Sequence, residues 1–381
     1  MKRFILLVVG LVLLSACVKE KPEEQTPTGD QEFALLIYMA GDNSMAKEIE
    51  YSLQSIQKGA RWGQGDVVVY LDRPNASPQL IKITKKGEQE QIKSYEEEDS
   101  GLVSSLTQAL KDTQALYPKK KYGLVIWSHG DGWLPWLRST AMDSSSGSAI
   151  NIDELADALP DGGLEYIWFD ACFMGSIEVF YQLRGKARYL VGSPTEVVMA
   201  GAWDASGAPY HKMLPYLFGG GESLKKACAQ FLQHYQEKPA GSTLQSASIV
   251  LVETAGLGRL HEAAARALGG KQGQLEGLDR SKVQAYHRQD YSMKYYYDLG
   301  DVVRNLGGSD AGWLSAMEGC VLFKGATPRF TQSTKVGEES YVEIDPKRFS
   351  GISCYLPLAS EAESNHYRYY FAELNWSSVW R

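Results

Sequence analysis

The chain has 381 residues, of which 44% are hydrophobic and 22% are charged, and its formal net charge at pH 7 is −7. This length and composition are sufficient for a sizeable core in one large domain or two smaller ones. The acidic balance, with no basic run beyond residues 119–121, argues against nucleic acid as a partner.

The first residues have the pattern of an export signal. Lys2 and Arg3 are followed by an apolar run at residues 4–13 and by small residues before Cys17. This order is typical of a cleaved signal peptide, and the apolar run is too short to span a bilayer. A cysteine at this place resembles the lipobox of bacterial lipoproteins, so we expect a signal peptide at residues 1–16 and lipid on Cys17. The alternative is an ordinary signal peptide with a chance cysteine.

A polar segment follows the expected lipidation site. Residues 19–30 contain proline and lack large apolar side chains, so they cannot contribute to a core. We interpret residues 17–31 as a tether that holds a globular body away from a membrane. The expected location of the protein is therefore the outer membrane or the cell surface, with attachment to the membrane through the lipid on Cys17.

Buried strands and amphipathic helices alternate from residue 33 onward. Apolar runs predict strands at residues 33–40, 66–72, 122–130, 164–172 and 187–193. Helices are expected between them, at residues 45–57, 102–116, 151–159 and 174–183. A short antiparallel piece is expected at residues 80–83. This α/β alternation predicts a mostly parallel sheet with helices on both faces.

After about residue 215 the pattern becomes less regular. One further strand is expected at residues 249–253, and helices are expected at residues 257–268 and 311–320. We therefore divide the globular body into a domain at residues 32–215 and a C-terminal region at residues 216–381. The C-terminal region is expected to pack on the first domain or to extend it.

Two of the expected strands end next to reactive side chains. The run at residues 122–130 leads to His129, and the run at residues 164–172 leads to Cys172. A helical crossover at residues 151–159 would place these strands side by side and parallel. In open α/β sheets, chemistry gathers beyond the carboxyl ends of the strands. We therefore expect His129 and Cys172 at the same edge of the sheet.

The two residue types suit nucleophilic catalysis. A thiol with the usual pKa of about 8.5 is mostly protonated at neutral pH, so a cysteine nucleophile needs a neighbouring base. His129 could take the thiol proton and later protonate the leaving amine. The backbone N–H groups of Gly130 and Cys172 could stabilise the oxyanion, and no third side chain is required. The alternative is that His129 merely ends a strand and that Cys172 is an inert buried thiol.

Three separated motifs together resemble the clostripain-like cysteine peptidases. They are Tyr-Met-Ala-Gly-Asp-Asn at residues 38–43, Ser-His-Gly-Asp-Gly-Trp at 128–133 and Phe-Asp-Ala-Cys-Phe-Met-Gly at 169–175. The resemblance covers about residues 33–210. It implies the three-layer sandwich shared by caspases, gingipains and legumains, with Gly130 and Cys172 at the oxyanion hole. It also implies a cysteine endopeptidase that requires no cofactor.

Asp170 lies two residues before Cys172, so the two side chains share one face of the strand. The resemblance implies that Asp170 forms the floor of a pocket for arginine or lysine, which a carboxylate binds by charge-assisted hydrogen bonds. The alternative is a structural aspartate that bonds nearby backbone. Glu196 and Asp204 are expected to form another wall of the pocket. Residues 202–205, however, read Ala-Trp-Asp-Ala where the family has a Gly-Trp-Asp-Tyr-like run.

The resemblance also implies a zymogen that cuts itself after a basic residue. Arg138 is the single basic residue in residues 133–148, so we expect an activation cut at Arg138 or a loop that covers the cleft. Calcium dependence occurs in the family and stays open here. No known calcium-loop spacing relates the available carboxylates, which are Asp143, Asp153, Asp157 and Asp161.

Two classes of function remain. The first is an exported, lipid-anchored cysteine endopeptidase that cleaves proteins or peptides after arginine or lysine. The second is a catalytically inactive binding lipoprotein on the same fold. Tyr291 and the tyrosines at residues 295–297 could line a groove in such a protein, but packing is the simpler interpretation. The presence of both His129 and Cys172 favours the enzyme, because a binding protein needs neither residue at those strand ends.

Overall fold

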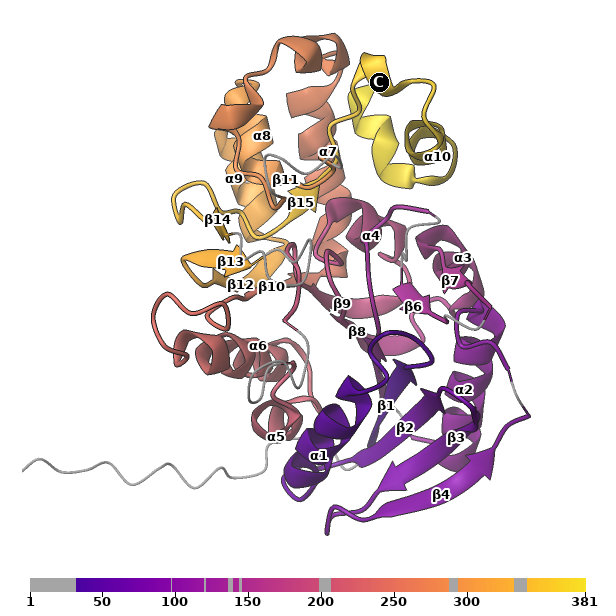
Figure 1. Ribbon diagram of the computed structural model, residues 1–381. Helices are drawn as coiled ribbons and strands as arrows, with labels where there is room; N and C mark the ends of the chain where they lie inside the picture. Colours follow the sequence, from indigo (N-terminus) through magenta and orange to yellow (C-terminus); the bar gives the residue numbers. More distant parts are fainter. Residues whose placement is uncertain are drawn as a thin grey trace, which may run out of the picture.

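The computed structural model (Figure 1) describes residues 32–96, 98–119, 121–135, 140–143, 146–198, 207–287, 294–331 and 341–381. The expected signal peptide, the tether and Cys17 lie outside these residues, and so do Arg138 and Asp204. Within the described ranges, no helix combines the length and the apolar composition that crossing a membrane requires.

Five parallel strands form the centre of the fold. In chain order they are β1 (Phe33–Ala40), β2 (Asp66–Arg73), β5 (Lys121–Trp127), β8 (Leu164–Asp170) and β9 (Ala187–Gly192). β5 lies between β1 and β8, while β2 pairs with β1 and β9 pairs with β8. All eight residues of β1 are buried. Apolar runs of this kind form strands that are covered on both faces.

Antiparallel strands extend this centre at both ends. β3 (Ala76–Ile83) and β4 (Gln89–Ser94) continue from β2, and β10 (Ser248–Glu253) and β12 (Val321–Ala326) continue from β9. The complete order is β12-β10-β9-β8-β5-β1-β2-β3-β4. The predicted mostly parallel sheet is confirmed. The antiparallel piece expected at residues 80–83 is the end of a longer hairpin strand.

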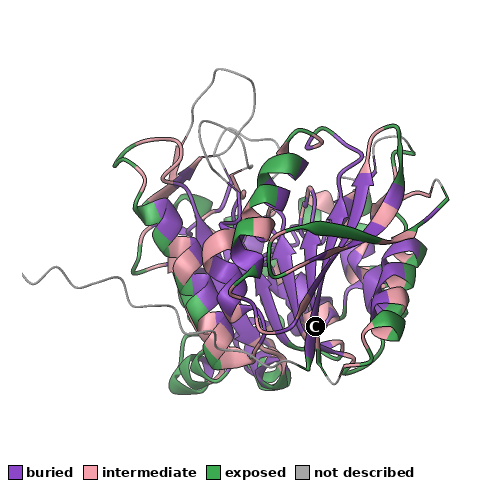
Figure 2. Ribbon diagram, turned by 90° about the horizontal axis from the view of Figure 1, so that it is seen from below, coloured by how far each residue is buried: buried purple, intermediate pink, exposed green. Residues whose placement is uncertain are grey.

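Helices cover both faces of the sheet, which confirms the predicted layers. One face packs against α1 (Glu48–Ala60), α5 (Tyr210–Met213) and α6 (Gly221–Gln236). The other face packs against α2 (Val103–Leu116), α3 (Ile152–Ala158), α4 (Ile177–Gln182) and α7 (Leu257–Leu268). Alternation along β1 explains the two cores, because Leu35 and Ile37 enter one while Leu36 and Tyr38 enter the other. Figure 2 shows the central strands buried along their length.

The later part of the chain adds short elements around the extended sheet. Its further helices are α8 (Leu299–Asn305), α9 (Ala311–Glu318) and α10 (Asn365–Glu373). Among the described residues of this part, β11 (Tyr297–Asp298) pairs with β15 (Ser353–Cys354), and β13 (Arg329–Thr331) pairs with β14 (Tyr341–Glu343). Earlier in the chain, β6 (Thr140–Met142) pairs with β7 (Ala149–Ile150). Short 3₁₀ helices are η1 (Leu214–Tyr216), η2 (Thr254–Gly256), η3 (Gln272–Gly277), η4 (Arg280–Lys282), η5 (Ala359–Glu361) and η6 (Asn375–Trp380).

The C-terminal region is tied to the centre of the sheet. β10 and β12 belong to the same sheet as β1, and the Ser353 N–H donates to the Gly175 carbonyl at 3.0 Å, just beyond β8. The Tyr355 N–H donates to the buried Glu178 carboxylate at 2.8 Å. The division at residue 215 stays a prediction. The described cysteines, which are Cys172, Cys228, Cys320 and Cys354, are free thiols.

Candidate active site

The carboxyl ends of β5 and β8 meet at one edge of the sheet. β5 ends at Trp127 and β8 ends at Asp170, and these two residues are paired in the parallel register. The chain continues for two residues beyond each strand, to His129 and to Cys172. The register therefore brings His129 and Cys172 to the same edge of the sheet.

The backbone after His129 lies against the backbone of Cys172. A Cβ added to Gly130 would lie 2.7 Å from the Cys172 carbonyl oxygen and 3.2 Å from the Cys172 nitrogen. Such a contact leaves room for glycine alone, because any side chain would collide with the neighbouring main chain. The main chains of Gly130 and Cys172 therefore run in direct contact.

The segment that follows β9 holds the half-buried Cys172. The Val197 N–H donates to the Cys172 Sγ at 3.2 Å, and the Phe173 N–H donates to the Thr195 carbonyl at 3.1 Å. Burial raises the pKa of the Cys172 thiol well above its usual value, and the charge of Glu196 raises it further. The thiol is therefore protonated at neutral pH in this arrangement.

His129 contacts a residue that the sequence analysis did not single out. The Ser44 Oγ lies 2.8 Å from Nε2 of His129. Ser44 belongs to the turn after β1, where the Asn43 side-chain amide donates to the carbonyls of Ala40 and Met142, both at 2.8 Å. The position of Ser44 in the sequence could have indicated it as a site residue, because a turn after a central parallel strand lies at the same sheet edge as His129.

Asp170, the last residue of β8, is 6% exposed. The Tyr210 hydroxyl, from α5, donates to Oδ2 of Asp170 at 2.7 Å. Burial raises the pKa of Asp170 to about 6, and the hydrogen bond from Tyr210 limits the rise. The carboxylate is therefore ionised at neutral pH and becomes protonated below pH 6.

The other predicted site residues are placed only in part. Glu196 is half-buried and precedes Val197, whose N–H contacts the thiol. Asp204 and Arg138 lie outside the described residues. The structure therefore brings Glu196 to the thiol and leaves the other expected pocket wall and the expected activation cut as predictions.

Three of the four carboxylates considered for calcium bond protein groups, and among them Asp153 accepts from the Tyr369 hydroxyl. Asp143 accepts from the N–H groups of Ser100 and Ser146, at 3.1 and 3.2 Å. Asp161 pairs with Lys186 at 2.6 Å. In the part of the chain that the structure describes, no three His, Cys, Asp or Glu side chains are grouped so that they could hold a metal ion. A calcium requirement stays a prediction.

The fold and this sheet edge define a class of protein. Residues 37–380 match the clostripain family, and the chain therefore belongs to that family. It is a cysteine peptidase, a hydrolase that acts on proteins or peptides. The resemblance found in the sequence and the caspase-like fold are both confirmed.

Solved structures of the same class cover nearly the whole chain. An inactive zymogen C11 protease from Parabacteroides distasonis is 27% identical with a TM-score of 0.78, and the match covers 93% of this chain and 99% of that one. A secreted C11 cysteine protease from Bacteroides thetaiotaomicron, in complex with an irreversible peptide inhibitor, is 28% identical with a TM-score of 0.78. That match covers 92% of this chain and 99% of the other. No curated protein matches the chain.

Proposed function

We propose that the protein is an exported cysteine endopeptidase in which His129 and Cys172 form the catalytic dyad. The observation that carries this proposal is the register between β5 and β8, which pairs Trp127 with Asp170. Because His129 and Cys172 each follow these strands by two residues, they lie at one edge of the sheet. A thiol and an imidazole on neighbouring strand ends suit nucleophilic attack. Export is supported by the signal-like residues before Cys17 and by the similar B. thetaiotaomicron protease, which is described as secreted.

The proposed reaction uses the Cys172 Sγ as its nucleophile. Sγ attacks the scissile carbonyl carbon while the thiol proton passes to His129, and the carbonyl oxygen becomes an oxyanion. The N–H groups of Gly130 and Cys172 stabilise this oxyanion. The C–N bond then breaks as His129 gives the proton to the leaving amine. Water then attacks the resulting thioester while His129 takes its proton, and the C–S bond breaks as His129 returns that proton to Sγ.

The proton transfer is proposed to accompany substrate attack. Before substrate binds, the Cys172 thiol accepts the hydrogen bond from Val197 while His129 contacts Ser44. Burial raises the pKa of the thiol, so little thiolate exists at neutral pH. We therefore infer general-base catalysis by His129 rather than a preformed thiolate and imidazolium pair.

We also propose that the enzyme cleaves after arginine or lysine. Asp170 ends β8 two residues before Cys172, and its carboxylate is ionised at neutral pH. A carboxylate in a buried site binds a guanidinium or ammonium group strongly. The charge of Glu196 supports the same preference, and Asp204 is proposed as a further part of the pocket.

Activation and anchoring complete the proposal. Arg138 is the single basic residue in residues 133–148, and the similar P. distasonis protease is described as an inactive zymogen. An Arg138→Ala chain should therefore remain intact and poorly active, and full activity of the intact chain would contradict the cut.

Lipid on Cys17 would hold the enzyme at the outer membrane or the cell surface. Metabolic labelling with a fatty-acid probe would detect this lipid.

The test of the activity is hydrolysis of matched fluorogenic peptides that carry Arg, Lys, Asn, Asp or Leu before the reporter. We expect cleavage after Arg and Lys, and a loss of at least about 1,000-fold in Cys172→Ala. Cys228→Ala is the matched control, because it removes a buried thiol from α6 and should keep the activity. Unchanged cleavage by Cys172→Ala would contradict the dyad, whereas equal rates on all peptides would contradict only the pocket.

A further inference from the structure

Tyr296 belongs to the C-terminal region but contacts the loop of the proposed nucleophile. It is 3% exposed. Its ring is stacked on the ring of Phe173, with centroids 4.2 Å apart and planes at 8°. Phe173 directly follows Cys172, so this stacking fixes the residue next to the thiol.

The hydroxyl of Tyr296 reaches the second loop of the site. It donates a hydrogen bond to the Asp131 carbonyl at 2.9 Å. Asp131 lies two residues after His129. One side chain therefore links the loop of the imidazole to the loop of the thiol.

Both loops have a left-handed backbone at this contact. The φ angle is +59° at Phe173 and +62° at Gly132. A residue with a side chain stays in this region only where its surroundings hold it there. A Cβ added to Gly132 would lie 3.0 Å from the Phe173 carbonyl oxygen and 3.3 Å from Cε1 of Tyr296. The three residues therefore form one close contact between the two loops.

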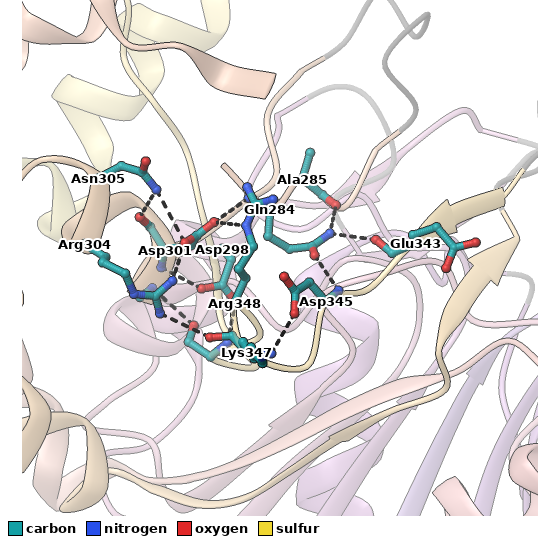
Figure 3. Close-up of polar contacts among 12 residues, drawn as sticks. Gln284, Ala285, Asp298, Asp301, Arg304, Asn305, Glu343, Asp345, Lys347 and Arg348 are labelled. Carbon is teal, nitrogen blue, oxygen red and sulfur yellow. Dashed lines mark hydrogen bonds and ion pairs between the residues drawn. The ribbon is translucent and has the colours of Figure 1, made fainter. Parts of the chain in front are cut away.

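A polar network fixes the segment that carries Tyr296. The Tyr286 N–H donates to the Tyr296 carbonyl at 2.8 Å, and the Tyr286 hydroxyl donates to Asp298 at 2.6 Å. Asp298 accepts from the Asp301 N–H at 2.9 Å, and Arg348 Nε donates to Asp301 at 2.7 Å. Figure 3 shows Asp298 and Asp301 among the side chains of this network. These bonds therefore hold the backbone of the segment that carries Tyr296.

We propose that Tyr296 is a positioning residue that keeps the loops of His129 and Cys172 at the separation needed for proton transfer. This inference rests on the proposed dyad. The ring fixes the loop of the thiol, and the hydroxyl fixes the loop of the imidazole. Small misplacements of reacting groups cost large factors in rate, so the effect should fall on kcat. Asp170, which is proposed to bind the basic side chain of the substrate, is not part of this contact, so KM should change little.

The test compares Tyr296→Phe and Tyr296→Leu with Tyr166→Phe in the full-length protein. Tyr166 is a matched control, because its buried hydroxyl also donates to a main-chain carbonyl, that of Leu217, at 2.8 Å. For each variant, kcat and KM are measured with an arginine peptide, and Tm is measured separately. We expect kcat to fall about tenfold in Tyr296→Phe and further in Tyr296→Leu, with KM within about twofold of wild type. Tyr166→Phe should keep the wild-type kcat at any temperature at which it is folded.

Equal kcat values for Tyr296→Phe and Tyr166→Phe would overturn the positioning role, and so would a loss confined to KM. The arms of the experiment also separate this inference from the proposed function. Activity that depends on Cys172, combined with a normal kcat in Tyr296→Phe, would overturn only the inference. Full activity in Cys172→Ala would overturn the dyad and the inference together.

Discussion

The parallel centre of the sheet and the C-terminal region are held together in different ways. β1, β5 and β8 contain seven or eight residues each, and regular backbone ladders join them. β11 and β15 contain only two residues each, and the carboxylate of Asp298, in β11, accepts from Tyr286, Asp301 and Ser350. A ladder survives the loss of one side chain, whereas a buried polar network depends on each member.

This difference bears on the proposed mechanism. His129 and Cys172 follow long strands whose register is fixed by many backbone bonds. Tyr296, which contacts both of their loops, belongs to the part with short strands. The two proposed reacting groups therefore depend on the parallel centre for their place along the sheet, and on the C-terminal region for the packing between their loops.

Asp298→Ala should have the largest effect on stability, because it breaks the centre of the C-terminal network. The substitution leaves three buried donors without an acceptor, and each such donor costs about 1–3 kcal/mol. We expect the free energy of unfolding, measured in urea, to fall by about 4 kcal/mol. The control Asp161→Ala removes the exposed carboxylate that pairs with Lys186 and should cost less than about 1 kcal/mol. Equal losses of stability in the two variants would contradict the claim that the C-terminal region depends on its buried polar network.

Asp170 should give the parallel centre a distinct pH dependence. Its pKa is raised to about 6, so it gains a proton as the pH falls below 6 and loses its attraction for a basic side chain. The kcat/KM of wild type for an arginine peptide, divided by that of Asp170→Asn, should fall about tenfold per pH unit below this pKa. Dividing by the variant removes the pH dependence that both proteins share. A ratio that is constant from pH 4 to 8 would contradict the pocket.

The raised pKa of Asp170 also predicts how the stability of the folded protein changes with pH. The pKa of Asp170 is higher in the folded protein than the value of about 3.9 in an unfolded chain, so protonation favours the folded state. Its stabilising contribution is present in full below pH about 4 and is lost as the pH rises to about 6. Wild type should therefore lose stability over this window relative to Asp170→Asn, as measured by Tm. The opposite trend would show that the carboxylate is not buried as described.

Ser44→Ala should reduce kcat by a smaller factor. The substitution removes the hydroxyl that lies 2.8 Å from His129 Nε2, and with it one restraint on the ring. We expect kcat to fall about fivefold, with little change in KM. The control Ser281→Ala removes a hydroxyl that bonds Asp279 at 2.6 Å in the C-terminal region, and should leave kcat unchanged. Equal kcat values in the two variants would show that Ser44 does not orient the imidazole.

Glu196→Gln should have the smallest effect and should act on the thiol itself. The charge of Glu196 raises the pKa of Cys172, so removing this charge lowers that pKa and increases the thiolate fraction. We expect alkylation of Cys172 by iodoacetamide at pH 7.5 to become about threefold faster. The control Glu222→Gln changes an exposed carboxylate on α6 and should leave the rate unchanged. Slower alkylation in Glu196→Gln would contradict this electrostatic effect.

The centre of the fold was predictable because its strands are long apolar runs. β1 occupies residues 33–40 as predicted, and β8 begins at the predicted Leu164. Helix α1 begins at Glu48 rather than at Met45, because Met45 is in a turn and its N–H donates to the Asn43 side chain at 2.8 Å. β4 was not predicted, since its six residues are mostly polar and it lies at the sheet edge.

The candidate site was predictable only at residues whose type and position indicate catalysis. Cys172 and His129 stand out because they follow apolar runs. Ser44 does not stand out, because serine is common in turns. The sequence predicts that the tyrosines at residues 295–297 pack against a neighbouring surface, and the burial of Tyr296 agrees with this. The Tyr296 hydroxyl, however, bonds a residue 165 positions away, and such a contact leaves no local sequence pattern. Tyr291, from the same cluster, lies outside the described residues.

The most direct test of the dyad is to identify the residue labelled by an irreversible, thiol-directed peptide that ends in arginine. Intact-mass measurement and peptide mapping would count and locate the adducts. We predict one adduct per chain, on Cys172, formed much more slowly in His129→Ala. Labelling of Cys228, Cys320 or Cys354 instead, or equal rates in wild type and His129→Ala, would contradict the proposed dyad.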